Sequence, residues 1–226
     1  MNNIHPTAII DERVTIGVNN IIYPYTVIYG PTKIGDDNII GPNVVIGMPG
    51  ADTKNPRYDS CHCQIVIGSR NIIREFTSIQ KPFYESITFL GDDIYLMQGV
   101  NISHDVQISS KVVVTAMCAI AGITKLLEGA NLGMGCTINQ HSVIGQYSIV
   151  ATGAAVMKNV KPFSRYIPNK PITVNKYAIK KFGFQCYCDE IFDYVMNDNL
   201  PSSKILLDMV NEFNIKCAKS ERPLYR

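Results

Sequence analysis

The fold is decided by residues 90–156, which read LGDDIY-LMQGVN-ISHDVQ-ISSKVV-VTAMCA-IAGITK-LLEGAN-LGMGCT-INQHSV-IGQYSI-VATGAA-V, with an aliphatic residue at the start of every group of six. The same spacing runs from Ile4 to Ile46 and again from Ile67 to Ile79. An amphipathic helix would repeat its apolar residues about every 3.6 positions, and a half-buried strand would alternate them. A period of six instead predicts a β-solenoid of hexapeptides, each a short strand followed by a corner.

Three hexapeptides complete one triangular coil, so residues eighteen positions apart are expected to stack on neighbouring coils about 4.8 Å apart. Two interruptions of the period predict loop insertions near 48–65 and 80–89. From about residue 172 the apolar residues follow a helical spacing. We therefore predict an all-β solenoid over 1–171 and a small C-terminal α-helical region over 172–226.

Composition excludes several other classes of protein. The 226 residues carry a net charge of only +2, which argues against a nucleic-acid-binding surface. No apolar run approaches the roughly 20 residues of a membrane span, and the first residues lack the pattern of a signal peptide. Seven cysteines, an odd number, favour a reduced cytoplasmic chain. The two C-x-C pairs are more tightly spaced than usual zinc ligands and the four histidines are scattered, so we expect no metal.

Four segments resemble a known family: SRNIIREF (69–76), LMQGVNISHDVQI (96–108), IAGITK (120–125) and AIKKFGF (178–184). They are similar to the hexapeptide-repeat acyltransferases, above all to the UDP-N-acetylglucosamine O-acyltransferases of lipid A synthesis, and the scaffold is shared by sugar-nucleotide N-acyltransferases. The hexapeptide resemblance covers about residues 4–170. It implies a left-handed parallel β-helix and a homotrimer with active sites between neighbouring solenoids.

The resemblance also implies a reaction. An acyl group would move from an acyl carrier protein or coenzyme A thioester to a hydroxyl or amine of a UDP- or dTDP-linked sugar, for lipid A or surface polysaccharide, with no permanently bound cofactor. Near the end of the solenoid, Lys161, Arg165 and Lys170 are candidates to meet a coenzyme A phosphate or an acidic carrier protein, or else form a solvated surface.

His104 is the catalytic candidate, because it lies at a corner and a histidine with a pKa near 6.5 suits a general base near neutrality. Asp105 would orient the imidazole and stabilise its protonated form. Gly122 is eighteen residues later, so its N–H is expected one coil above His104, where it could stabilise an oxyanion. Direct attack of the acceptor on the thioester is expected, because no serine or cysteine nucleophile is indicated.

The resemblance implies substrate-binding roles for five further residues. They are Asp52 and Lys54 in the first insertion, Asn101 and Gln140 around the base, and Lys181 for a phosphate. This sequence departs from the family where histidines are replaced by Gln80, Asn101, Ile123 and Asn139, and where Phe182 replaces an arginine. These departures favour an acceptor other than the usual sugar nucleotide, such as an amino sugar for surface polysaccharide.

Two other functions fit the repeat. A non-catalytic hexapeptide scaffold or binding protein would keep the period without a His–Asp pair one coil below a glycine. A zinc enzyme of the γ-carbonic anhydrase type would need three histidines that converge between subunits, and their spacing here does not supply them.

Overall fold

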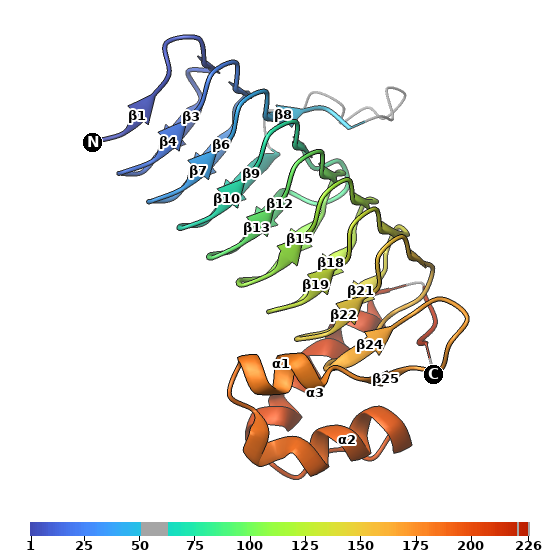
Figure 1. Ribbon diagram of the computed structural model, residues 1–226. Coiled ribbons are helices and arrows are strands. Elements are labelled where there is room, and N and C mark those ends of the chain that lie inside the picture. Colours follow the sequence, from blue (N-terminus) through green and yellow to red (C-terminus); the bar gives the residue numbers. More distant parts are fainter. Residues whose placement is uncertain (51–62, 221, 226) are drawn as a thin grey trace.

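The computed structural model describes residues 1–50, 63–220 and 222–225, which form a coil of three β-sheets, parallel except for an antiparallel last strand, with helices at the C-terminal end (Figure 1). Each of strands β1 to β20 pairs with the strand three places further along the chain, so every sheet takes one strand from each turn of the coil. This arrangement agrees with the hexapeptide period, because most strands are short and end on a buried aliphatic such as Ile22, Ile28 or Ile102.

The strands divide among the sheets in sequence order. Sheet A contains β1 (Asn3–Ile4), β4 (Ile21–Ile22), β7 (Ile39–Ile40), β10 (Ile72–Ile73), β13 (Tyr95–Leu96), β16 (Val113–Val114), β19 (Asn131–Leu132), β22 (Ile149–Val150), β24 (Ser164–Tyr166) and β25 (Thr173–Val174). Sheet B contains β2 (Ile9–Ile10), β5 (Val27–Ile28), β8 (Val45–Met48), β11 (Ser78–Gln80), β14 (Asn101–Ile102), β17 (Ala119–Ile120), β20 (Thr137–Ile138) and β23 (Ala155–Val156). Sheet C contains β3 (Val14–Ile16), β6 (Thr32–Ile34), β9 (Gln64–Ile67), β12 (Ile87–Leu90), β15 (Gln107–Ile108), β18 (Lys125–Leu126) and β21 (Val143–Ile144).

Both interruptions of the period fall between a strand of sheet B and the next strand of sheet C, and the pairing of β11 with β8 shifts its register between Ile79 and Gln80. Strand β8 ends at Met48 and β9 begins at Gln64, while β11 ends at Gln80 and β12 begins at Ile87. The second insertion therefore spans 81–86, a narrower segment than the sequence predicts, because 87–90 already pair with β9 as a strand. Beyond each insertion the aliphatic anchors return to the interior.

The anchors fill a narrow core that runs the length of the coil. Ile28, Ile46, Ile79, Ile102 and their equivalents on later coils are fully buried. Each side chain of this size contributes roughly 1.5–3 kcal/mol when it is removed from water. At the N-terminal end no coil lies beyond the first, and Ile4 is accordingly 39 % exposed.

A ladder of buried asparagines stabilises the corner between sheets C and A. The side-chain oxygen of Asn20 accepts the backbone N–H of Asn38, that of Asn38 accepts the N–H of Asn71, and that of Asn71 accepts the N–H of Ile94, at 2.8–2.9 Å. The sequence separations are 18, 33 and 23 residues, so the ladder continues across both insertions. Each rung links one coil to the next inside the protein.

Four helices close the C-terminal end of the coil: α1 (Lys176–Lys181), η1 (Gln185–Tyr187), α2 (Cys188–Asn197) and α3 (Lys204–Ala218). Their apolar residues Ile179, Ile191 and Leu206 join the same core as the solenoid anchors. Lys161, from the last coil, is buried and donates from Nζ to the carbonyls of Tyr194 and Val195 in α2 and to Asp198. No helix among the described residues is long and apolar enough to cross a membrane.

Replacement of one rung of the asparagine ladder tests its contribution to stability. Asn38→Ala leaves the N–H of Asn71 and the carbonyl of Gly68 without their side-chain partner inside the protein. We expect the free energy of unfolding, measured by urea denaturation, to fall by about 1–3 kcal/mol. Asn3→Ala, on an exposed strand residue, is the matched control and should change it by less than about 0.5 kcal/mol. Equal effects of the two substitutions would contradict the role of the ladder.

Candidate active site

The site is built at the corner that follows sheet B, where successive coils place equivalent residues above one another. His104 follows β14, and Gly122 lies one coil further along, after β17, because Asn101 pairs with Ala119. The backbone N–H of Ile123 donates to the carbonyl of His104 at 3.0 Å, which ties the two corners together. The eighteen-residue spacing thus brings the histidine and the glycine into contact.

Gly122 is required by the position of the imidazole. A Cβ atom at this position would overlap Cε1 and Nε2 of His104, so any larger residue would displace the ring. Among the described residues, the N–H of Gly122 has no hydrogen-bond partner. The corner therefore holds a donor next to the imidazole that is available to a negatively charged oxygen.

Asp105 binds the imidazole and a segment of the second insertion at the same time. Its carboxylate accepts from Nδ1 of His104 at 2.7 Å and from the backbone N–H groups of Phe83, Tyr84 and Glu85 at 2.9–3.2 Å. The Asp105 side chain is fully buried, whereas that of His104 is 16 % exposed. The Nδ1 proton faces the carboxylate, so Nε2 carries the lone pair that can accept a substrate proton.

Burial alone would raise the pKa of Asp105, but its hydrogen bonds act in the opposite direction. The bond from His104 and those from the backbone N–H groups of residues 83–85 favour the ionised carboxylate, and together they hold the pKa of Asp105 below its usual value. The carboxylate therefore stays charged near neutrality and can stabilise a protonated His104.

Two aromatic rings fix the plane of the imidazole. Phe83 is fully buried and stacks on His104 with 5.0 Å between ring centroids, and Tyr84 lies against the same imidazole at 5.6 Å. The backbone N–H of Asp105 donates to the hydroxyl of Thr88, so Thr88 helps to hold Asp105 in place. Position, plane and tautomer of His104 are thus set by residues 83–88 and Asp105.

The roles of Phe83, Tyr84 and Thr88 are missed by sequence reasoning. The period does place β12, which begins at Ile87, in the coil that precedes β15, and so brings the second insertion close to the His104 corner. The stacking and the three N–H groups, however, depend on the path of residues 81–86, for which the six-residue period has no rule.

A groove of about 290 Å³ begins beside this pair and continues along the outer face of sheet B. It starts at Ser103 and Ala121, which precede His104 and Gly122, and reaches Met157, two coils beyond Ala121. Small side chains such as Ala119 leave the space open. An extended chain lying in this groove would have one end next to Nε2 of His104.

The other residues predicted for the site lie in different places. Asn101 donates to Ser78 and accepts from Ser103 on the face of sheet B, but it does not line the groove. Gln140 occupies the same corner two coils above His104, and its carbonyl accepts from Arg222. Asp52 and Lys54 lie outside the described residues.

Lys181 lies on another face of the coil from His104. It lines a small hollow over sheet A, together with Lys111, Asn131 and Tyr177, whereas the groove beside His104 is on sheet B. A single chain therefore does not bring Lys181 to the base. In the described part of the chain, no group of three or more His, Cys, Asp or Glu side chains is arranged to hold a metal ion.

Comparison with known proteins adds to this geometry. Residues 13–47 match the family model described as bacterial transferase hexapeptide (six repeats). An acyl-(acyl-carrier-protein)–UDP-N-acetylglucosamine O-acyltransferase of Herminiimonas arsenicoxydans is 32 % identical over 203 residues, which cover 81 % of this chain and 78 % of that protein. Its namesake in Albidiferax ferrireducens is 45 % identical over 122 residues, 46 % of each protein, so this match spans about half of that relative.

Solved structures share the fold over nearly the whole chain. A UDP-N-acetylglucosamine acyltransferase from Bacteroides fragilis superimposes with a TM-score of 0.83 at 22 % identity, covering 99 % of this chain and 100 % of that one. The corresponding O-acyltransferase from Moraxella catarrhalis gives a TM-score of 0.73 at 25 % identity and covers 99 % of each chain.

The pH dependence of stability tests the buried carboxylate. Asp105→Asn replaces an acceptor of three N–H groups by an amide, and we expect it to lower the free energy of unfolding at pH 7 by about 1–3 kcal/mol. Because the pKa of Asp105 is lower in the folded protein, its contribution is complete above the unfolded value of about 3.9 and is lost as the pH falls through the folded value. The difference between the wild type and the variant in urea titrations should therefore begin to shrink below about pH 4 and disappear once the pH is below the lowered pKa of Asp105. Asp208→Asn, on the exposed face of α3, should show no such pH-dependent difference.

Proposed function

The chain belongs to the family of acyl-(acyl-carrier-protein)–UDP-N-acetylglucosamine O-acyltransferases, and from this premise we propose that it transfers an acyl group from a thioester to a nucleotide-linked sugar. The observation that carries the proposal is the contact of Gly122 with an imidazole whose Nδ1 is held by a buried carboxylate. The similarity in fold to the solved acyltransferases supports assigning the coil the left-handed sense.

In the proposed reaction, His104 acts as the general base. Its Nε2 accepts the proton of the acceptor hydroxyl while the hydroxyl oxygen attacks the thioester carbonyl, and the Asp105 carboxylate stabilises the resulting imidazolium. The N–H of Gly122 donates to the negatively charged carbonyl oxygen of the tetrahedral intermediate. Collapse of the intermediate breaks the carbon–sulfur bond, and the imidazolium returns its proton to the leaving thiolate, so no acyl-enzyme forms.

The groove on sheet B is our candidate for the acyl chain. Its walls include the small apolar side chains of Ala119 and Ala121, which suit an apolar chain, while Ser103 at its near end adjoins the base. The proposed donor of this chain is an acyl carrier protein or coenzyme A thioester. The cytoplasmic location of the protein stays a prediction.

The first acceptor that we propose is UDP-N-acetylglucosamine, the sugar nucleotide in the relatives' name. Asp52 and Lys54 are proposed to bind its sugar and Lys181 its phosphate. In support of this proposal, strand β8, which precedes Asp52 in the sequence, stacks with β11 and β14 in sheet B, and β14 directly precedes His104. Asn101 and Asn139 stand where the family has histidines, and for this reason we propose an amino-sugar nucleotide as a second possible acceptor.

We propose a homotrimer because, within one chain, His104 and Lys181 lie on different faces of the coil. A second copy whose sheet A faces sheet B of the first would bring its Lys181 to His104. The edge between sheets A and B is suited to such contact, because it exposes large apolar side chains: Tyr25, Phe76, Met117 and Met134 are 55–66 % exposed. Burial of this edge would remove apolar surface from water in each copy.

The central test is acyl transfer by purified protein. Acyl carrier protein and coenzyme A thioesters are offered with UDP-N-acetylglucosamine or amino-sugar nucleotides, and products are identified by mass spectrometry. The wild type should form product, and His104→Ala should lose at least a hundredfold in kcat, within the range of roughly 10²–10⁴ for a general base. His141→Asn, one residue past Gln140 at a corner with φ of 65°, keeps a residue suited to that conformation and should retain activity. Undiminished activity of His104→Ala would refute the mechanism.

Mixed trimers test whether the site is shared between copies. His104→Ala and Lys181→Ala should each have low activity alone, the first in kcat and the second through a raised KM for the nucleotide sugar. Co-expression of the two should recover part of the activity, because some interfaces then combine an intact His104 with an intact Lys181 from another copy. Co-expression of two differently tagged His104→Ala chains is the control. Failure of the mixed protein to exceed the better single variant would show that the site lies within one chain.

A further inference from the structure

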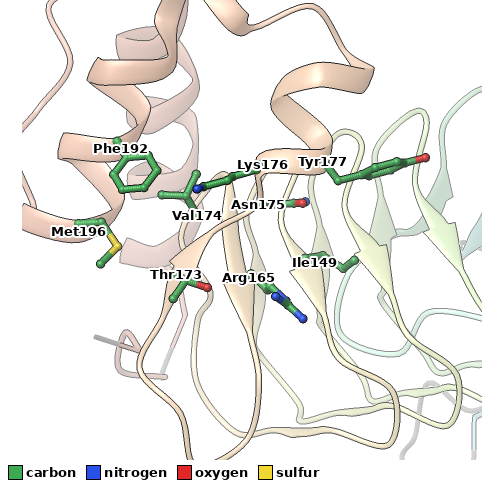
Figure 2. A pocket seen from close by; sticks show the side chains of 9 residues that line it. All are labelled: Ile149, Arg165, Thr173, Val174, Asn175, Lys176, Tyr177, Phe192 and Met196. Atoms are coloured by element: carbon green, nitrogen blue, oxygen red, sulfur yellow. The ribbon is translucent and has the colours of Figure 1, made fainter.

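A second cavity lies at the C-terminal end of sheet A, where β22, β24 and β25 meet α1 and α2 (Figure 2). Its volume is about 580 Å³, twice that of the groove beside His104. Its lining residues are Ile149, Arg165, Thr173, Val174, Asn175, Lys176, Tyr177, Phe192 and Met196. None of the residues assigned to base, oxyanion or sugar binding is among them.

Two cations line this cavity and no acid does. Arg165 extends from β24, and Lys176, the first residue of α1, extends toward Phe192 with Nζ 5.5 Å from the ring centroid (Figure 2). In the described part of the chain, no carboxylate lies within ion-pair distance of either side chain. The cavity therefore carries two positive charges that an anionic ligand would neutralise.

The remaining walls are apolar and accessible. Phe192 and Met196 of α2 are 39 % and 47 % exposed, and Ile149 and Val174 also line the cavity. The amide of Asn175 is already engaged, since it donates to the carbonyl of Tyr147 and accepts from the N–H of Ala178. A ligand that fits must combine an anionic group with an apolar or aromatic part.

We propose that this cavity binds a phosphate ester whose neighbouring group is apolar or aromatic. The planar guanidinium of Arg165 can donate two parallel hydrogen bonds to phosphate oxygens, and the ammonium of Lys176 adds a point charge. Phe192 and Met196 supply an aromatic face and a polarisable thioether for the adjoining group. Phosphate fits better than a carboxylate here because two cations match its higher charge.

Two candidate ligands follow from the proposed function, on which this step rests, because both proposed substrates carry phosphate esters. Coenzyme A represents the donor side, and UDP-N-acetylglucosamine represents the acceptor side. The cavity shares Ile149, Asn175 and Tyr177 with the hollow that Lys181 lines, so either ligand could extend into it from the site between copies.

Binding is measured by isothermal titration calorimetry on the full-length protein, with coenzyme A and UDP-N-acetylglucosamine as separate probes. For one of the two, Arg165→Gln and Lys176→Gln should each weaken affinity about 10- to 100-fold, the effect of losing a charge-assisted hydrogen bond. Phe192→Ala should weaken the same probe. Lys204→Gln, an exposed lysine outside the cavity, is the charge-matched control and should leave both affinities unchanged.

The probe that responds identifies the source, and its KM in the transfer assay should rise while kcat is largely retained. Unchanged affinity for both probes in Arg165→Gln and Lys176→Gln, with the variants folded as judged by thermal unfolding, would overturn the inference. Binding of an intact carrier protein that depends on these residues, without binding of either small ester, would also overturn it. Absence of acyl transfer would refute the proposed function. An affinity for either probe that depends on Arg165 and Lys176 would still support the proposed binding site in this cavity.

Discussion

The structure depends on one constraint: the coils must stack so that each buried aliphatic anchor lies on another and the strands of one coil, from β1 to β23, pair in parallel with those of the next. Ile102 on Ile120 on Ile138 is one such column. A coil can change its length only at a corner, outside the core, because a change within a strand would turn its anchor outward. The strands that flank both insertions stay in their sheets, and the asparagine ladder continues past the insertions with its hydrogen bonds intact.

The same constraint places the chemistry. Corners are where side chains leave the core, and stacking puts the corners of successive coils within contact of each other. His104 and Gly122 become neighbours without any local sequence relationship, through two strands that pair for structural reasons. The second insertion then contributes what a regular coil lacks, since its backbone N–H groups converge on Asp105 and its aromatic rings cover the imidazole. A regular scaffold and one irregular segment together orient the base.

The sequence allowed the parallel coil, the C-terminal helices and the His104–Gly122 contact to be predicted, because all three follow from periods of six, eighteen and about 3.6 residues. It did not predict the stacking of Phe83 or the cavity beside Arg165. These depend on the path of an insertion and on the docking of helices, which are set by tertiary packing and leave no periodic signal. Asp52 and Lys54 depend on the family resemblance alone, and Lys181 shows why such residues need coordinates: its face of the coil differs from that of the base.

The basic residues near the end of the coil show how far charge can be interpreted from sequence. Lys161 and Arg165 are four residues apart and look equivalent, as a cluster for a phosphate or an acidic surface. Packing gives them opposite roles. Lys161 is buried at the end of α2, where two carbonyls and Asp198 accept hydrogen bonds from its ammonium, so removing it would take a donor away from both carbonyls. Arg165 faces outward from β24 into a cavity without acids. A buried cation needs a partner, whereas an exposed one does not. Lys161 therefore anchors a helix, and Arg165 is available to bind an anion.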